Sequence, residues 1–278
     1  MTSEHSTAPI PPHDIGHFNT RRLGRRLWTF PCVDSTNALA LSLSNDPAND
    51  GLVLLAEEQT SGRGQYGRTW TAPPGSSVLL SAVLLPPPLL RRPALLTAWA
   101  AVSVCETILE VAGLEATIKW PNDVLVEGRK VCGILIEQRN TGNADAPLAA
   151  AVGIGLNVRQ AADVFVHANL PLAGSLASLS GKVLETRWVA EQLIRQLDNV
   201  YDRLLAGDMT TLEVFWKRRL GLVGTQVLVE TAHQQHQGKL MDVGWDGVVL
   251  EGAAGLVRLV PESVRHIEDK CDGCFPAS

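Results

Sequence analysis

The 278-residue sequence has few of the features that define specialised classes of protein. Its five cysteines do not form the disulfide framework of a small secreted domain, which favours a reducing cytoplasm. The net charge of −5 argues against a general nucleic-acid binder. The first twenty residues lack the apolar core of a secretory signal, the apolar run 78–90 is broken by prolines, and the run 94–105 is too short to span a membrane.

What the sequence does contain is typical of a folded globular protein, with 45% apolar and 19% charged residues. Strand patterns at 51–58, 76–85, 115–120, 123–127, 131–139 and 147–156 accompany helical patterns at 93–113, 187–207 and 210–220. We expect a hairpin turn at 128–130. After Gly221, short strands alternate with glycine-rich turns over roughly fifty residues, which is typical of a small β-barrel. Because there is no regular β-α-β alternation, the sequence predicts an α+β fold with a mixed, mainly antiparallel sheet packed by helices, then a β-barrel.

The stretch Ser61–Trp70 (SGRGQYGRTW) contains a G-x-G-x-x-G pattern without the context of a dinucleotide site. The Rossmann fingerprint requires a helix to follow, but Pro73 and Pro74 come almost at once. The H-R-D and D-F-G motifs of kinases and a Walker A loop are also absent from the sequence. Glycines that expose backbone N–H groups beside Arg63 and Arg68 suit an anion-binding loop that closes over a ligand, although an ordinary solvated hairpin fits the same pattern.

A second unusual stretch is Lys119-Trp-Pro-Asn-Asp-Val124, where a proline interrupts a β-like context. The chain must turn or bulge there, which directs Lys119 and Asp123 into one pocket or leaves them as a surface pair. Nearby, Lys130 begins a strand, and Gly133 lets a ligand or another backbone pass close to that strand.

Five motifs in this order resemble those of the biotin protein ligases, also called biotin–[acetyl-CoA-carboxylase] ligases. They are Asp34-Ser-Thr-Asn37, Gln59 with Gly62–Trp70, Lys119-Trp-Pro-Asn-Asp123, Arg129–Glu137 and Gly153-Ile-Gly-Leu-Asn157. The resemblance implies a class II synthetase-like catalytic domain and an SH3-like C-terminal barrel. It places a flexible segment at 1–28, the biotin- and ATP-binding catalytic domain at 29–221, the SH3-like domain at 222–268 and a tail at 269–278.

The resemblance also implies a cytoplasmic, ATP-dependent and AMP-forming ligase with two half-reactions. Biotin attacks the α-phosphorus of ATP with Mg²⁺ present, giving biotinyl-5′-AMP and pyrophosphate. A lysine of the biotin carboxyl carrier protein of acetyl-CoA carboxylase then takes the biotinyl group. Fixed cations and a closing loop suit this chemistry, because charge accumulates on phosphate oxygens and the intermediate hydrolyses in water. The family also allows a homodimer, and we expect no contact with specific DNA or with a membrane.

The site residues implied by the family's motifs fall into overlapping groups. The biotin site comprises Ser35, Thr36, Asn37, Gln59, Gly62, Arg63, Gly64, Lys130 and Gly133. The ATP and adenylate site comprises Arg63, Gln65, Arg68, Trp70, Lys119, Asn122, Asp123, Asn157, Glu262 and Arg265. The implied catalytic residues are Arg63, Lys119, Asp123 and Lys130, and Asp123 is also the candidate Mg²⁺ ligand and the candidate base for the acceptor lysine.

Some features depart from the family's pattern or leave alternatives open. Many members carry arginine where this chain has Gln65, so we expect looser retention of the intermediate. Only 33 residues precede Asp34, from which we expect no helix-turn-helix repressor domain. A lipoate or octanoate transferase and a non-catalytic biotin-dependent regulator are the competing interpretations. The Cys271-Asp-Gly-Cys274 pattern fits a loose tail better than a zinc site.

Overall fold

The computed structural model describes residues 12, 14–140, 148–253 and 255–270. The C-x-x-C cysteines, Cys271 and Cys274, lie outside these residues. Most of the chain forms an eight-stranded sheet with strand order β1-β2-β3-β4-β8-β7-β6-β5. Its strands are β1 (Asp14–Gly16), β2 (Leu27–Val33), β3 (Val53–Gln59), β4 (Ser77–Leu84), β5 (Ala116–Lys119), β6 (Asp123–Val126), β7 (Arg129–Asn140) and β8 (Leu148–Asn157). The pair β2–β3 is parallel and the other neighbouring strands in the sheet are antiparallel.

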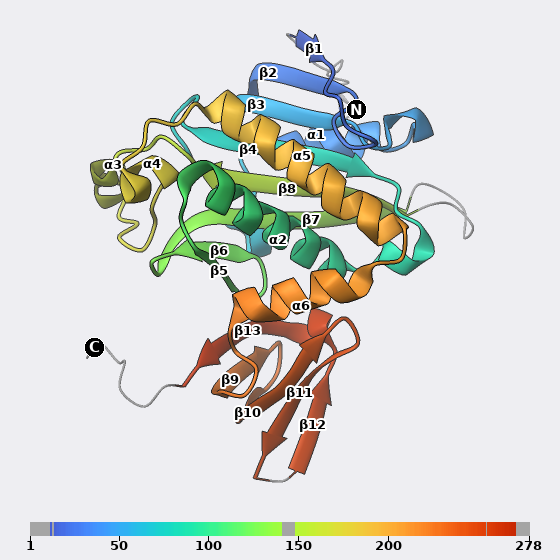
Figure 1. Cartoon of the computed structure of the whole chain (residues 1–278), viewed down its shortest axis with the longest axis vertical. Coiled ribbons are helices and arrows are strands. Elements are labelled where there is room, and N and C mark those ends of the chain that lie inside the picture. The colour runs from blue at the N-terminus through green and yellow to red at the C-terminus, as the bar shows by residue number, and fades with distance from the viewer. Residues whose placement is uncertain (1–11, 13, 141–147, 254, 271–278) are drawn as a thin grey trace, which may run out of the picture.

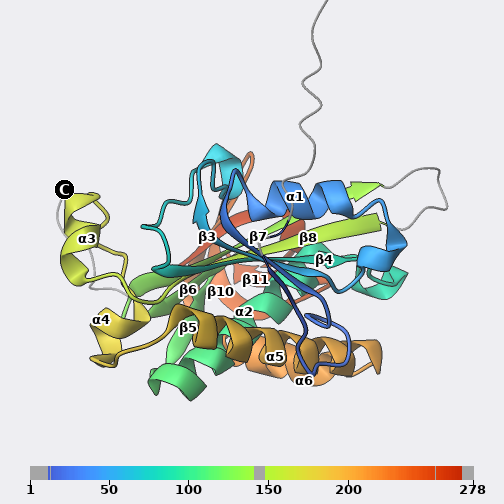
Figure 2. The same ribbon diagram turned by 90° about the horizontal axis from the view of Figure 1, so that it is seen from above.

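Helices cover both faces of this sheet (Figure 2). The helix α1 (Thr36–Leu43) lies on one face, and α2 (Pro93–Ala112) and α5 (Thr186–Leu205) lie on the other. Pro93 opens α2 and Gly113 ends it with a φ of 72°, as expected for a proline start and a left-handed glycine stop. The remaining helices are α3 (Ala162–His167), α4 (Leu176–Ser180) and α6 (Met209–Leu220), and short 3₁₀ turns lie at Pro47–Asn49, Gln65–Gly67, Pro88–Leu90 and Pro261–Ser263.

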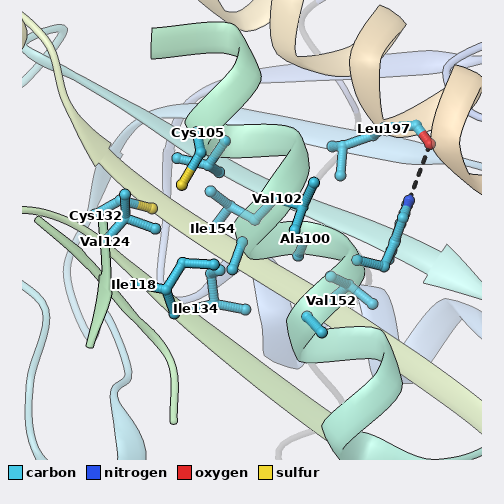
Figure 3. Close-up of a cluster of buried hydrophobic side chains, with 14 of the residues drawn as sticks. Ala100, Val102, Cys105, Ile118, Val124, Cys132, Ile134, Val152, Ile154 and Leu197 are labelled. Atoms are coloured by element: carbon cyan, nitrogen blue, oxygen red, sulfur yellow. Dashed lines mark hydrogen bonds between the residues drawn. The ribbon is translucent and has the colours of Figure 1, made fainter. Parts of the chain in front are cut away.

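The central strands β7 and β8 present two different faces because side chains alternate along a strand. On the face toward α2, apolar side chains of both strands pack with those of the helix, and Cys105 and Cys132 belong to this core (Figure 3). Burial raises the pKa of the Cys105 thiol to about 12 and raises that of Cys132 well above its ordinary value. On the opposite face β8 carries small residues, with Gly155 paired to Gly133 and Gly153 paired to Leu135. These glycines let other side chains come close to the backbone on this side of the sheet.

A second sheet of five antiparallel strands follows α6, with order β12-β11-β10-β9-β13 (Figure 1). Its strands are β9 (Gln226–Thr231), β10 (Gln235–Gly244), β11 (Gly247–Gly252), β12 (Gly255–Leu259) and β13 (Val264–Asp269). Trp216 of α6 packs between Trp120 and Trp245, with ring centres at 5.7 and 4.9 Å. Trp120 Nε1 also donates a hydrogen bond to Val264 O at 3.0 Å. These contacts fix the second sheet against the end of the first.

The predicted α+β class is confirmed, while several local expectations need correction. Helices α3 and α4 and strand β13 carry no pattern strong enough to predict them, since each is only five or six residues long. The hairpin turn falls at Glu127 and Gly128, both with positive φ, one residue before the expected 128–130. Within 1–28, β1 pairs with β2, and Asp198 accepts hydrogen bonds from the backbone N–H groups of residues 21–23, so 14–28 is structured rather than flexible.

Helix α2 is long and apolar enough to cross a membrane by length and composition. However, 72% of its most apolar window is buried inside the protein, which is typical of a core helix.

Candidate functional site

A cavity of about 780 Å³ lies over the glycine-bearing face of β7 and β8. Its walls come from the start of α1, the 61–70 hairpin, the turn between β5 and β6, α3 with the segment after it, and strand β13 of the second sheet. The volume is within the range of small-molecule sites, which are concave and combine apolar walls with a few polar groups.

One end of the cavity is closed by a network of buried polar side chains. Gln59 Oε1 accepts hydrogen bonds from Thr36 N at 2.8 Å and from Thr36 Oγ1 at 3.1 Å. The Ser81 hydroxyl lies 2.8 Å from Thr36 Oγ1 and 2.9 Å from Asn37 Oδ1. Ser35 is the N-cap of α1, and this helix packs against β3, β4 and β8. This end of the cavity therefore suits a ligand part with several hydrogen-bonding groups.

Asn37 extends the polar network to β7. Its Nδ2 donates to Glu137 Oε2 at 2.8 Å and to Leu135 O at 3.3 Å. Gly153 gives it room, since a Cβ there would lie 2.6 Å from Asn37 Oδ1. The second carboxylate oxygen of Glu137, Oε1, pairs with Arg63 Nη2 at 2.5 Å. The network thus runs without interruption from the closed end of the cavity to the glycine hairpin.

The glycine stretch 61–70 folds as a tight hairpin over the cavity. Gly64 N donates to Arg68 O at 2.7 Å, and Trp70 N donates to Gly62 O at 3.1 Å. Gly62 is required there, because a Cβ would lie 2.2 Å from Trp70 O.

At the hairpin tip, Tyr66 has a φ of 56°, and 62% of its surface is exposed. The Arg265 guanidinium of β13 lies 5.6 Å from the centre of the Tyr66 ring, within the range of a cation–π contact. The second sheet therefore touches the hairpin directly.

The Trp70 ring covers the glycine floor. A Cβ would lie 3.0 Å from this ring at Gly133 and 2.5 Å from it at Gly155. Trp70 Nε1 is buried and has no hydrogen-bond partner among the described residues. Gly133, which was expected to leave space for a ligand, lines the cavity and lies beside the Trp70 ring. The glycines thus position an aromatic surface inside the cavity.

Lys130 and Asp123 form an ion pair at 2.7 Å between Nζ and Oδ1. Their side chains are 37% and 24% exposed, so both remain accessible from the cavity. Lys130 Nζ also lies 5.8 Å from the Trp70 ring centre. The structure therefore places a partly exposed cation beside the aromatic floor, with a carboxylate that compensates its charge.

Two amides expected to bind nucleotide are engaged by the protein. Asn122 Nδ2 donates to Ile134 O at 2.6 Å and holds the β5–β6 turn against β7. Asn157 Nδ2 donates to Gly174 O at 3.0 Å, and its Oδ1 accepts from Gln160 Nε2 at 3.0 Å. Both side chains therefore have a structural task in addition to any contact with a ligand.

The cavity brings together most of the residues expected from the sequence. Those that line it are Ser35, Thr36, Asn37, Gln59, Arg63, Gly64, Gln65, Arg68, Trp70, Lys119, Asn122, Asp123, Lys130, Gly133 and Asn157. Gly62, Glu262 and Arg265 do not line it. Gly62 is buried against Trp70 O within the hairpin, and Arg265 contacts the cavity-lining Tyr66 ring.

Sequence reasoning missed several residues at the cavity, notably Ser81, Leu135, His266 and Glu268. Ser81 had a detectable signal, because its hydroxyl interrupts the apolar run 78–84 of β4, and the structure shows it fully buried. The side chains of β13 gave no such signal, because their place at the cavity depends on how the second sheet packs.

The fold and the cavity together define an α+β small-molecule-binding protein whose site suits an elongated anionic ligand. Residues 29–157 match the model of the biotin/lipoate A/B protein ligase family. The biotin–[acetyl-CoA-carboxylase] ligase of Mycobacterium tuberculosis is 32% identical over 260 residues, which is 86% of this chain and 94% of that protein. The bifunctional ligase/repressor BirA of Bacillus subtilis is 31% identical over 83% of this chain and 70% of that protein. The Aquifex aeolicus biotin protein ligase in complex with biotin and ATP has the same fold, with a TM-score of 0.72, 23% identity, and coverage of 88% of this chain and 99% of that one.

The chain therefore belongs to the biotin protein ligase family and is a ligase. This confirms the family expected from the five sequence motifs.

Proposed function

We propose that the protein activates biotin with ATP to biotinyl-5′-AMP and transfers the biotinyl group to a lysine of a biotin carboxyl carrier protein. The cavity is the main support, because its buried polar end and its cationic end are joined by an apolar and aromatic wall. A heterocycle with urea-like donors and acceptors matches the Thr36, Asn37 and Ser81 end. An apolar chain with a terminal carboxylate would then extend toward Arg63 and Lys130.

In the first half-reaction, negative charge accumulates on the biotin carboxylate and on the ATP phosphates. We assign Arg63 and Lys130 to the joined carboxyl and phosphate oxygens, because both line the cavity near the Trp70 floor. Arg68 and Lys119 are exposed cations of the same cavity and are assigned to the remaining phosphates. Fixed cations of this kind stabilise the developing charge without reorganisation.

Trp70 is the proposed contact for the adenylate, because its ring forms the floor of the cavity and its indole N–H lacks a partner among the described residues. In the second half-reaction the acceptor lysine must lose a proton before it attacks the mixed anhydride. Asp123 is the proposed base, and its release from the pair with Lys130 would follow when Lys130 turns to the phosphate.

The described residues contain no group of three His, Cys, Asp or Glu side chains that could hold a metal ion. We propose that Mg²⁺ would be carried mainly by the ATP phosphates, with Asp123 as its protein carboxylate, as is usual for a cation that keeps most of its water.

We divide the chain into a catalytic domain at 29–221 and an SH3-like domain at 222–268, and we place the enzyme in the cytoplasm. We also propose that it is a ligase without repressor activity. The chain aligns with 94% of a relative named only as a ligase but with 70% of the bifunctional one.

The decisive test is the exchange of labelled pyrophosphate into ATP, run with biotin and in parallel with lipoate and octanoate. Biotin-dependent exchange followed by labelling of a carrier domain is expected. Exchange driven by lipoate or octanoate would identify a transferase of the related class, and biotin binding without exchange would identify a regulator. Salt-dependent binding to a specific operator in a gel-shift assay would contradict the absence of repressor activity.

A further inference from the structure

The carboxylate of Glu137 joins two parts of the site that are far apart in the sequence. Its Oε2 accepts from Asn37 Nδ2 at 2.8 Å, in the polar network, while its Oε1 pairs with Arg63 Nη2 at 2.5 Å, in the hairpin. Neither side chain of this pair is fully exposed to solvent: the exposed fraction is 22% for Glu137 and 44% for Arg63. A single side chain therefore contacts both the closed end of the cavity and the loop above it.

The hairpin has few other polar attachments to the sheet. Among the described residues, the Arg63–Glu137 pair is the one salt bridge made by residues 61–70. Its other contacts with the body include the hydrogen bond from Ser61 N to Asp34 O at 2.9 Å, the Trp70 ring over the glycine floor and the Tyr66 ring beside Arg265. Because most residues of the hairpin are exposed and it buries little surface, its order depends strongly on each attachment.

The pair also controls where Arg63 points. An arginine in a glycine-rich loop has many rotamers, and a carboxylate that accepts its N–H group restricts them. Glu137 is itself held in place by Asn37, whose Oδ1 lies 2.9 Å from Ser81 Oγ. A ligand that orders Asn37 and Ser81 thereby also orders Glu137, and through Glu137 it orders Arg63.

We infer that Glu137 is a positioning residue that couples occupation of the polar end of the cavity to the order of the glycine hairpin. It does so by holding Arg63 in the direction of the ligand carboxylate. The inference rests on the proposed function only for the identity of the ligand, which is biotin. The effect of Glu137 on the order of the hairpin in the absence of ligand does not depend on the proposed function. By reciprocity, whatever orders the hairpin must also tighten ligand binding in the network.

Limited digestion with trypsin measures the order of the hairpin, because Arg68 is an exposed cleavage site within it. The rate of cleavage follows the population of the open hairpin when opening is fast relative to cleavage. The test compares the full-length protein with the Glu137→Gln variant, whose amide oxygen still accepts from Asn37 but whose charge is lost. Glu57→Gln is the matched control, because Glu57 is an exposed carboxylate of β3 that does not line the cavity.

Without ligand, we expect the rate of cleavage at Arg68 to rise about fivefold in Glu137→Gln, because a partly exposed ion pair is lost. The rate should stay unchanged in Glu57→Gln. Biotin should protect the wild-type hairpin, and should protect that of Glu137→Gln much less. The Michaelis constant for biotin should rise about tenfold in Glu137→Gln, with a smaller change in kcat. Thermal unfolding of each variant checks that the fold is kept.

A double-mutant cycle separates this role from a merely structural one. Arg63→Gln should increase cleavage at Arg68 in the wild-type background and add little in the Glu137→Gln background. Additive effects would overturn the inference, as would equal ligand-free cleavage of wild type and Glu137→Gln. If biotin neither binds nor protects the wild-type protein, it is the proposed function that fails, and the ligand-free cycle still decides the role of Glu137.

Discussion

The ring of Trp70 lies directly on the backbone of Gly155, so closely that a Cβ at this position would come within 2.5 Å of Trp70 Cε2 and 2.8 Å of Trp70 Nε1. A loop residue and a strand residue thus share one small space, and the strand is built from glycine to allow it. The position of the aromatic floor depends on this contact.

The first prediction concerns Gly155→Ala, which should displace the Trp70 ring. Forcing a methyl group into this contact should lower the free energy of unfolding by about 1–3 kcal/mol, as for other overpacked sites. It should also weaken ATP binding, measured by calorimetry. Gly16→Ala is the control, because its Cβ would make only ordinary contacts at 3.6 Å or more. Unchanged ATP affinity in Gly155→Ala would contradict the proposed role of Trp70.

The second prediction concerns the hydroxyl of Ser81. Ser81→Ala leaves Asn37 Oδ1 without this donor in a buried place, which should lower the free energy of unfolding by about 1–3 kcal/mol. Ser103→Ala is a matched control, since Ser103 is equally buried but its hydroxyl donates within α2 to Trp99 O. Both variants should lose stability, and Ser81→Ala alone should raise the Michaelis constant for biotin. If the Michaelis constant for biotin were the same in the two variants, this would argue against a ligand at the polar network.

The third prediction concerns the stability of the protein at low pH. Hydrogen bonds from Lys217 and from Arg92 lower the pKa values of Asp242 and Asp246, which hold the second sheet to α6 and to the start of α2. A carboxyl with a lowered folded-state pKa stabilises the protein above its ordinary pKa of about 4 and loses that effect as the pH falls through the folded value.

The contact of the second sheet should therefore weaken progressively below about pH 4. Asp242→Asn should lower stability at neutral pH and flatten the loss between neutral and acid solution, measured by denaturant unfolding at several pH values. Glu251→Gln, at an exposed carboxylate of β11, is the control. If the free energy of unfolding of Asp242→Asn fell with pH in parallel with that of the wild type, the Lys217–Asp242 pair would not contribute to the acid sensitivity.

The fourth prediction concerns Gln65, which lines the cavity within the hairpin. Gln65→Arg adds a charge-assisted donor near the acyl phosphate and should slow the release of biotinyl-AMP several-fold. The release rate is measured by trapping free intermediate after dilution. Gln226→Arg, at an exposed position of β9, adds the same charge away from the cavity. Equal or faster release from Gln65→Arg than from the wild type would refute the expectation.

Much of the site was present in the sequence as local chemistry. The N-capping run before α1 and the proline in Lys119–Asp123 restrict the backbone locally, and the glycines of the hairpin allow close approaches that other residues cannot make. These residue types therefore indicate the local conformation. The buried strands and the long helices were predictable for the same reason, since their apolar patterns extend over many residues.

Other features depend on contacts between segments that no local pattern links. Trp70 lies over Gly133 and Gly155, Arg63 meets Glu137, and β13 brings His266 and Glu268 to the cavity. The sequence alone determined the fold class from periodicity, and from motifs of fixed spacing it determined the family and many of the polar residues around the cavity. Only the tertiary structure decided which side chains pair, because the partners lie up to about 200 residues apart (Tyr66 and Arg265, for example) and meet through the packing of two sheets.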